Sequence, residues 1–525
     1  MRRLAPINPR SGRVIKLKSL FRVLALVMAL LLFAAACGSD GKPGNKKASF
    51  KDSGPFVGPG EAVPQEQPGS PSSATDTAKK ARRTKAEASR EDVEAGTVIN
   101  GITDTHIEVV YYWKGDQTRT SAFLKGTGVE SNVDEGVGFQ TWIEYINKHA
   151  AGGGSIMGFP FNLHGRKLVG RVIDVGSSPE DASATAEYIA SDLKPFAAVA
   201  AHGSLSAYTC PRLARAGVFS LATFNVDFGM YGKTNGYCIP SAASFDAQLD
   251  AVQGYLSERV ADDPYRGTVN QEPRRFGLVY AEYPGLVEAI PEVVARLRSS
   301  GVNVVEVASV SASLTDAQGE SSNVIAKFVG AGVNTVIIPD AGTPMSFTPA
   351  AESHDYHPDY FIWPCSGQDS HAMVRLYNAN QWGRAKGLTC YDPQFMHDIV
   401  IDDQSRQSEW YTKYMSMSRG EPPAQAPYIY SALLPLVTGI TNAGPNLNPK
   451  TFGAGLDAFS PYRYSGLGAP ASSNMLLSMD RAERNIVGDF TVLQWSNTAH
   501  RGGGSLAGAY VFPENGRRYG RDEFR

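Results

Sequence analysis

Cys37, the first cysteine of the chain, directly follows an apolar segment near the N-terminus, and its thiol could be chemically modified there. An apolar run (residues 23–36) ends in three alanines directly before it. That run is shorter than the roughly 20 residues that a membrane-spanning helix needs. Seven basic residues and no acidic residue precede the cysteine. A cationic segment followed by a short apolar run and small residues is typical of a secretory signal.

This segment resembles the lipobox of bacterial lipoproteins, in which the cysteine is acylated and becomes the new N-terminus. Ala35, Ala36 and Gly38 around Cys37 match that pattern, whereas residues 33 and 34 are less typical of it. Each buried CH₂ of an acyl chain adds about 0.8 kcal/mol of membrane affinity. The resemblance implies a lipid-anchored protein on the extracytoplasmic face of the bacterial cell membrane. An ordinary signal peptide cleaved nearby is the alternative.

Four further cysteines lie in the rest of the chain: Cys210, Cys238, Cys365 and Cys390. An even number of cysteines in an exported chain favours disulfide bonds, and three pairings are possible. We favour Cys210–Cys238 and Cys365–Cys390 because both pairs close short loops, each contributing about 3 kcal/mol by the chain-entropy model. Free thiols are the alternative, and no C-x-x-C pair supports a metal site.

Two other groups of side chains, in HGSLS and HDYH, give only weak indications of an active site or a metal site. His202 and Ser204 in HGSLS would suit a lipid-anchored hydrolase, but neighbours on one loop make a poor nucleophile and base, and the motif lacks the glycine of a G-x-S-x-G elbow. His354 and His357 in HDYH fit a solvated helix end better than a metal site. No dinucleotide-binding loop follows a strand. We therefore expect no enzyme, no catalytic residue, no metal and no cofactor.

Apolar β-branched runs alternate with helical patterns from residue 105 onward. Strands are expected at 105–112, 167–175, 196–201, 218–224, 276–282, 302–310, 335–340 and 360–364, and helices at 136–149, 179–193, 205–216, 245–260, 285–299, 321–330 and 346–354. This order predicts an α/β protein whose mainly parallel sheets are flanked by helices. Two series of elements, split near 240–247, predict two lobes. Since ligands bind beyond the carboxyl ends of parallel strands, we expect the binding site in a cleft between the lobes.

The chain divides by composition into an export segment, a tether and a folded part. We expect a signal peptide (1–36), the lipidated cysteine with a disordered tether (37–97), the first part of lobe 1 (98–244), lobe 2 (245–365), a return to lobe 1 (366–455) and a C-terminal segment contacting lobe 2 (456–525). Removing residues 1–36 changes the formal charge from −2 to about −9. This charge gives no indication of nucleic-acid binding.

From about residue 100 to 500 the chain resembles the solute-binding proteins of ABC transporters, in particular the branched-chain amino acid (Leu/Ile/Val) type with the type I periplasmic binding protein fold. The resemblance rests on stretches in the family's order: 146–174, SSPEDASATAEYIAS after Asp174, AHGSLSAYTCP (201–211), ARAGVFSLATFN (214–225), IPSAASFDAQLDAVQGYL (239–256), AEYPG (281–285) and PYIYSALLPLVTGI (427–440). It implies a binding protein for a small-molecule solute that partners with an ABC permease. A membrane-anchored sensor of the same fold is the alternative.

The resemblance also places candidate ligand-binding residues on loops that follow strands: Trp113, Ser204, Ser206, Thr223, Asn225, Tyr283 and Gln368. Ser204 and Ser206 would offer hydroxyl and N–H groups at a helix start to an anionic oxygen. Thr223 and Asn225 would face the cleft from the next loop. Tyr283 would come from lobe 2, Trp113 would form an apolar wall, and Gln368 lies in the hinge loop.

The hinge loop CSGQD (365–369) departs from the family pattern. Amino acid binders hold the ligand ammonium with a carboxylate near the second crossover, where this chain has Ser366 and Gln368, with Asp369 nearby. The family's tyrosine after the strand at 335–340 is also missing, and Gly342 or Thr343 stands in its place. We therefore expect a small polar or amphipathic solute and name no amino acid ligand.

Overall fold

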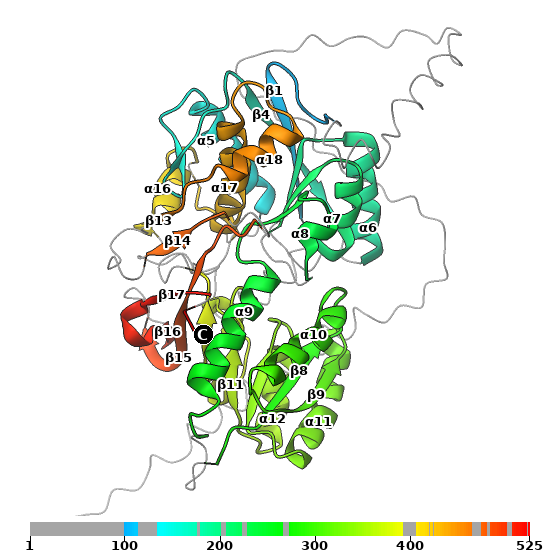
Figure 1. Cartoon of the computed structure of the whole chain (residues 1–525), viewed down its shortest axis with the longest axis vertical. Coiled ribbons are helices and arrows are strands. Elements are labelled where there is room, and N and C mark those ends of the chain that lie inside the picture. Colours follow the sequence, from blue (N-terminus) through cyan, green and yellow to red (C-terminus); the bar gives the residue numbers. More distant parts are fainter. Residues whose placement is uncertain are drawn as a thin grey trace, which may run out of the picture. The chain divides into compact units, whose positions relative to one another are not determined.

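The computed structural model describes residues 99–113, 134–175, 179–200, 206–222, 228–265, 272–391, 406–418, 420–423, 425–464, 474–479, 484–500, 507–521 and 523–524. Their helices pack against two separate main sheets (Figure 1). The expected signal peptide, Cys37 and the tether lie outside the described residues. Among the described helices, none has the length and apolarity needed to cross a membrane.

The first sheet is parallel throughout. Its strand order is β4 (Lys167–Asp174), β1 (His106–Trp113), β5 (Ala197–Ala200), β6 (Phe219–Ala222) and β7 (Cys238–Pro240). Its helices are α5 (Glu135–Lys148), α6 (Pro179–Tyr188) with a π-helical turn (Ile189–Leu193), α7 (Ser206–Arg215) and α8 (Met230–Lys233). Later in the chain come α16 (Glu409–Met415), α17 (Ala426–Ala443) and α18 (Pro449–Asp457), and α17 packs against α5 and β5. A short hairpin, β2 (Ser155–Ile156) and β3 (Phe159–Pro160), precedes β4.

The second sheet is mixed. Its order is β16 (Ala507–Val511), β15 (Asp489–His500), β12 (Ala385–Thr389), β11 (Asp359–Ile362), β10 (Thr335–Ile338), β8 (Phe276–Ala281) and β9 (Val304–Val310), and β17 (Arg518–Gly520) also pairs with β15. The strands from β9 to β12 are parallel, whereas β15 is antiparallel to its partners. Its helices are α9 (Phe245–Tyr255) with a π-helical turn (Leu256–Val260), α10 (Leu286–Ser299), α11 (Leu314–Gly330), α12 (Thr343–Ser353), α13 (His371–Val374) and α14 (Ala379–Trp382). The remaining elements are the pair β13 (Tyr462–Tyr464) and β14 (Met475–Leu477) and a 3₁₀ turn (Pro513–Gly516).

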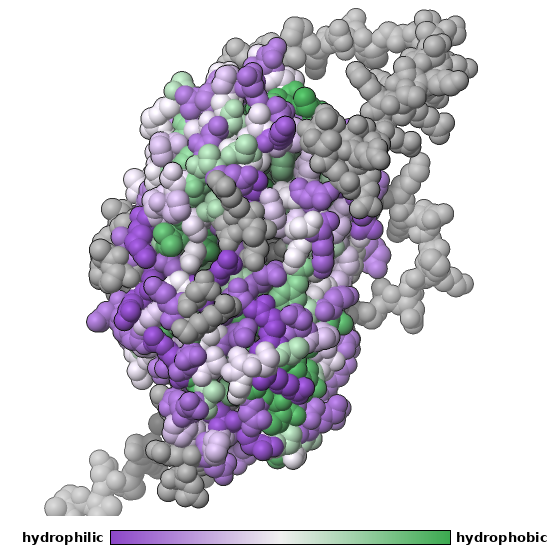
Figure 2. All heavy atoms as spheres, in the orientation of Figure 1, coloured by the Kyte–Doolittle hydropathy of each residue, from purple (hydrophilic) through white to green (hydrophobic). Residues whose placement is uncertain are grey.

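Local sequence explains where the main helices begin and how closely they pack. The Asp134 carboxylate accepts a hydrogen bond from Val137 N (3.1 Å) at the start of α5, and the Ser244 hydroxyl accepts one from Ala247 N (3.1 Å) at the start of α9. A Cβ on Gly277 of β8 would lie 2.8 Å from the Phe328 ring, so glycine lets α11 approach the sheet. Hydrophilic side chains cover most of the face shown in Figure 2, where apolar side chains form only small patches.

The predicted α/β class with two mainly parallel sheets is confirmed, and so is the pairing of the cysteines as Cys210–Cys238 and Cys365–Cys390. Three features differ from the expected elements. The second sheet continues through β12 to Thr389, whereas the sequence places the return to lobe 1 at 366. Helix α11 begins at Leu314 and not at 321. The short β7 and the antiparallel strands β15 to β17 were not expected.

Candidate functional site

Hydrogen bonds join the carboxyl end of β1 to helices α5 and α7. Trp113 is the last residue of β1; it is partly buried against the core, and its carbonyl accepts a hydrogen bond from Val175 N (2.7 Å). The two preceding tyrosines are buried and anchor the strand. The Tyr111 hydroxyl donates to Glu135 Oε2 (2.6 Å) at the start of α5, and the Tyr112 hydroxyl lies 3.0 Å from the Thr209 hydroxyl of α7. The strand end is therefore held in a defined position.

Glu135 is a buried carboxylate at this edge that the sequence reasoning missed. It is the first residue of α5 and is fully buried. A carboxylate at a helix N-terminus is stabilised by the helix dipole. Burial raises the pKa of the Tyr111 hydroxyl well above its ordinary value, and the neighbouring Glu135 raises it further. The sequence does show an acid at the first helical position, but it does not show that the side chain is buried.

Helix α7 begins at the same edge of the first sheet, at Ser206. Its position is fixed by the Cys210–Cys238 disulfide to β7 and by the contact between Thr209 and Tyr112. The first N–H groups of a helix lack intrahelical acceptors and suit an anionic oxygen. Of the residues proposed here, the structure describes Ser206 only as the first residue of this helix. Ser204, Thr223 and Asn225 lie outside the described residues.

Tyr283 follows the carboxyl end of β8 and presents a hydroxyl with no hydrogen-bond partner among the described residues. Burial raises the pKa of Tyr283 to about 12, and the charge of Asp340 contributes. Gly342 makes room for this hydroxyl, since a Cβ there would lie 2.9 Å from the Tyr283 oxygen. The Tyr283 hydroxyl is thus able to bind a ligand.

Asp340 fixes the loop that follows β10. Its carboxylate accepts hydrogen bonds from Ala281 N (3.1 Å), Gly342 N (2.9 Å), Thr343 N (2.7 Å) and the Thr343 hydroxyl (2.8 Å). Burial raises the pKa of Asp340, and these hydrogen bonds oppose the increase. The carboxylate therefore joins the end of β8 to the start of α12 and gives Tyr283 a rigid support.

Gln368 lies in the hinge loop with its side chain fully buried. Its amide N–H groups donate to the carbonyls of Ile338 (2.5 Å) and Asp340 (2.7 Å), and its amide oxygen accepts from Trp363 N (3.3 Å). The amide thus joins the ends of β10 and β11. We infer that Gln368 positions the loops at this edge of the second sheet.

Asp369 also points into the protein. Its carboxylate accepts hydrogen bonds from Cys365 N (3.0 Å), Gly367 N (3.2 Å) and the Thr389 hydroxyl (2.7 Å). Burial raises the pKa of Asp369 to about 6 from its ordinary value of 3.8. The Cys365–Cys390 disulfide joins the same loop to the end of β12. The hinge loop is thus fixed by its own acid and by a covalent bond.

In the part of the chain that the structure describes, no group of three or more His, Cys, Asp or Glu side chains is placed to hold a metal ion. His357 of the HDYH segment is engaged by protein groups, since Nδ1 lies 2.8 Å from the Gln381 amide and Nε2 lies 3.0 Å from Asp355 Oδ1. His202 and Ser204, which the hydrolase alternative requires, lie outside the described residues.

Several solved structures share this fold at low sequence identity. A solute-binding protein of an ABC transporter from Rhodopseudomonas palustris BisB5, in complex with 3,4-dihydroxy benzoic acid, is 12% identical with a TM-score of 0.53, and the match covers 80% of this chain and 98% of that one. A leucine-, isoleucine-, valine-, threonine- and alanine-binding protein from Brucella ovis is 14% identical with a TM-score of 0.52, covering 81% of this chain and 97% of that one. An ABC transporter substrate-binding protein from Sphaerobacter thermophilus is 14% identical with a TM-score of 0.52, covering 80% and 98%. These similarities show the type I periplasmic binding protein fold.

Sequence comparison gives a family but no individual relative. No curated protein matches the chain. The family model described as periplasmic binding protein matches residues 124–501, which is more than half of the chain and includes strands of both main sheets. The chain therefore belongs to the periplasmic binding protein family.

Proposed function

We propose that this chain is the extracytoplasmic solute-binding component of an ABC importer, that it catalyses no reaction, and that it holds a small polar or amphipathic solute between its two lobes. The family match over residues 124–501 is the observation that carries the proposal. The polar groups at the carboxyl ends of the strands support it, because ligands of parallel sheets bind at that edge. Closure around the solute would be a hinge motion driven by a higher affinity of the closed state.

The groups available at these edges favour a solute with a hydrogen-bond acceptor. The Tyr283 hydroxyl and the first N–H groups of α7 donate hydrogen bonds, and Trp113 offers an apolar surface. The hinge loop gives no support to recognition of a free α-ammonium group, because Asp369 binds its own loop and Thr389. Among similar folds, the Brucella ovis protein binds leucine, isoleucine, valine, threonine and alanine, and the Rhodopseudomonas palustris BisB5 protein is in complex with 3,4-dihydroxy benzoic acid. A free α-amino acid is therefore not the ligand that we favour.

A thermal-shift screen over amino acids, amides, short peptides, urea-like solutes and aromatic acids should yield a stabilising solute, because a ligand that binds only the folded state raises its stability. Tyr283→Phe is then expected to weaken that solute's binding about tenfold through loss of one hydrogen bond. Gly342→Ala should weaken it as well, since the added methyl group would lie 2.9 Å from the Tyr283 oxygen. Calorimetric titration measures both effects.

Tyr356→Phe is the matched control, because its hydroxyl donates to Val333 O (2.9 Å) in a turn away from these strand ends. This variant should bind the solute as the wild type does. Tyr283→Phe should keep the unfolding free energy of the unliganded protein. The proposal fails if no solute in the screen stabilises the protein, or if the Tyr283 and Tyr356 variants bind equally well.

Membrane attachment through Cys37 is part of the same proposal. Cys37→Ser should move the chain from the membrane fraction to the soluble fraction and abolish its labelling by an alkyne fatty acid, because serine lacks the thiol that is acylated. Ser39→Ala, next to the same position, should remain labelled and attached. A wild-type chain that takes up no label would remove the lipid anchor from the proposal and leave the binding role untouched.

A further inference from the structure

The described part of the chain begins at the amino ends of the first sheet, the edge opposite to the candidate site. The side-chain amide of Asn100 donates to Ala216 O (2.7 Å), shortly before β6, and Gly101 O accepts a hydrogen bond from Glu108 N (2.7 Å) of β1. Figure 1 shows this start of the chain in blue beside β1. Ile99, the first described residue, is exposed and therefore lies at the surface of this edge.

Six basic residues surround the same amino ends. Lys148 ends α5, next to the Asn147 amide that donates to Leu168 O (2.8 Å) at the start of β4. Lys450 lies in the first turn of α18, whose Phe452 ring is 5.0 and 4.5 Å from the phenylalanine rings at the starts of β5 and β6. Neighbouring strands lie about 4.8 Å apart, so the starts of β4, β1, β5 and β6 span about 15 Å. This amino-end surface consists of Lys148, Arg166, Lys167, Lys194, Arg215 and Lys450.

The positive charges of the amino-end surface exceed the negative charges beside them. Asp104, Glu108 and Asp192 lie at the same strand starts, so six cations stand beside three acids and leave an excess of three positive charges. In the described part of the chain, none of the six cations forms an ion pair with an acid. Such a group of cations creates a positive potential that attracts an external anion.

Stabilisation of helices explains only part of this arrangement. Lys148 and Arg215 end α5 and α7, where the helix dipole favours a cation. Lys450, in contrast, lies at the start of α18, where the dipole opposes a cation, and Lys167 begins a strand. A common external partner accounts for all of these positions.

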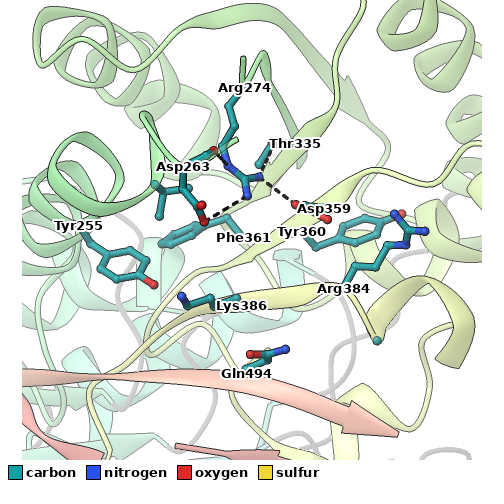
Figure 3. Close-up of a pocket in the computed structure, with 12 residues that line it drawn as sticks. Tyr255, Asp263, Arg274, Thr335, Asp359, Tyr360, Phe361, Arg384, Lys386 and Gln494 are labelled. Atoms are coloured by element: carbon teal, nitrogen blue, oxygen red, sulfur yellow. Dashed lines mark hydrogen bonds and ion pairs between the residues drawn. The ribbon is translucent and has the colours of Figure 1, made fainter. Parts of the chain in front are cut away.

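The amino ends of the second sheet do not offer the same unmatched charge. Arg274 is buried there, donates to Asp359 Oδ2 (3.0 Å) and lies 3.8 Å from Asp263 Oδ2 (Figure 3). The guanidinium charge is therefore balanced within the protein. The positive surface is a property of the edge at which the described chain begins.

The two edges of the first sheet carry charges of opposite sign. The carboxyl ends of its strands, with the first turns of α5 and α6, carry five acids: Asp134, Glu135, Asp174, Glu180 and Asp181. A flat anionic surface would therefore attract the amino ends and repel the carboxyl ends. Salt limits this attraction to charges within about 10 Å of the surface, so the acids at the far edge oppose it little.

We propose that the amino-end surface binds an anionic phospholipid bilayer. The inference deepens the proposed membrane attachment, because the chain from Cys37 enters the fold at this same surface, at Ile99. Each cation close to an anionic bilayer raises the affinity about fivefold, and a basic patch together with acyl chains holds a protein more firmly than either does alone. With the amino ends on the bilayer, the carboxyl ends point away from it and stay open to a solute.

Cosedimentation with lipid vesicles tests the proposal on residues 37–525 carrying Cys37→Ser, a form that has neither acyl chains nor the N-terminal apolar run. This form should bind vesicles of equal parts phosphatidylglycerol and phosphatidylcholine at low ionic strength, and should not bind vesicles of phosphatidylcholine alone. Added salt should weaken the binding, because it screens the attraction. Lys148→Gln/Lys167→Gln/Arg215→Gln should bind the anionic vesicles at least about tenfold more weakly.

The three replaced side chains are exposed and form no side-chain hydrogen bond within the described residues, so this variant should fold normally. Arg275→Gln/Arg298→Gln/Lys327→Gln is the matched control, because it makes the same change in net charge on exposed side chains around the second sheet and should bind as the parent does. Absence of binding to the anionic vesicles, equal binding to both kinds of vesicle, or equal losses in the two triple variants would overturn the proposal. Acylation of Cys37 and solute binding are judged separately, by fatty-acid labelling and by the thermal-shift screen.

Discussion

Replacing Arg518 by methionine is expected to lower the free energy of unfolding by about 3–5 kcal/mol, because it leaves a buried carboxylate without its main partner. Arg518 has a fully buried side chain, and its Nε donates to Oδ1 of Asp489 (2.7 Å), whose side chain is 2% exposed. Arg463 also contacts Asp489 (2.9 Å), but the Arg463 side chain is half exposed and screened by solvent. The remaining contact with Arg463 should therefore compensate little for the stability that is lost with Arg518.

The same guanidinium fixes the end of β12. Its Nη atoms donate to the carbonyls of Cys390 (2.8 Å) and Tyr391 (2.9 Å), where the chain leaves the second sheet, and to the Asp489 carbonyl (2.9 Å). Cys390 is also disulfide-bonded to the hinge loop. Arg518→Met should therefore weaken solute binding as well as the fold, since this segment supports the hinge loop.

Arg259 provides the matched control for this prediction. It forms an ion pair with Glu514 (3.2 Å), near Arg518 in the C-terminal segment, but both side chains are more than a third exposed. Arg259→Met should cost no more than about 1 kcal/mol. Urea unfolding of both variants measures the contrast, and similar losses would contradict the assignment of a buried ion pair. The Arg518→Met/Asp489→Asn double variant should lose less than the sum of the single losses, because the buried charge is removed with its partner.

Long apolar strands could be located from sequence alone, and strands that depend on distant partners could not. β1 and β4 are eight-residue strands whose β-branched and aromatic residues identify them directly. β12 has the sequence AKGLT, with a lysine and a glycine in a buried sheet, and its partner β15 begins about a hundred residues later. No local sequence pattern predicts the pairing of β12 with β15. The expected return to lobe 1 at 366 came too early for this reason.

The order of strands and helices was enough to predict which sheet edges hold the candidate site. It was not enough to predict the direction of individual side chains. Tyr283 lies at the predicted strand end. Gln368 was expected to contact ligand, yet its amide binds Ile338 and Asp340, about thirty residues earlier. Tyr255, Lys386 and Gln494, which line a cavity beside the second sheet, come from three distant segments. Only the register of the folded sheet brings such groups together.

Asp369 is expected to make the stability of the protein depend on pH between about 4 and 6. Burial raises the pKa of this carboxyl to about 6 in the folded protein, against 3.8 ordinarily. The folded state therefore binds a proton in this range that the unfolded state has released, so stability is highest below about pH 4 and falls as the pH rises through 6. Each pKa unit corresponds to about 1.4 kcal/mol, which gives up to about 3 kcal/mol from this one group.

Asp369→Asn isolates this contribution, because asparagine carries no charge at any pH and keeps an acceptor for Thr389 or for one loop N–H. When the pH is lowered from 7 to 4, the free energy of unfolding of the wild type should rise by up to about 3 kcal/mol relative to that of the variant. Urea unfolding experiments measure this difference. Asp355, which is 96% exposed, provides the control, and Asp355→Asn should show no comparable pH dependence relative to wild type. A constant difference between wild type and Asp369→Asn across this range would mean that the carboxylate stays ionised in the folded protein. Asp369 would then carry a negative charge in the hinge loop at all working pH values, and recognition of a solute ammonium group near this loop would again have to be considered.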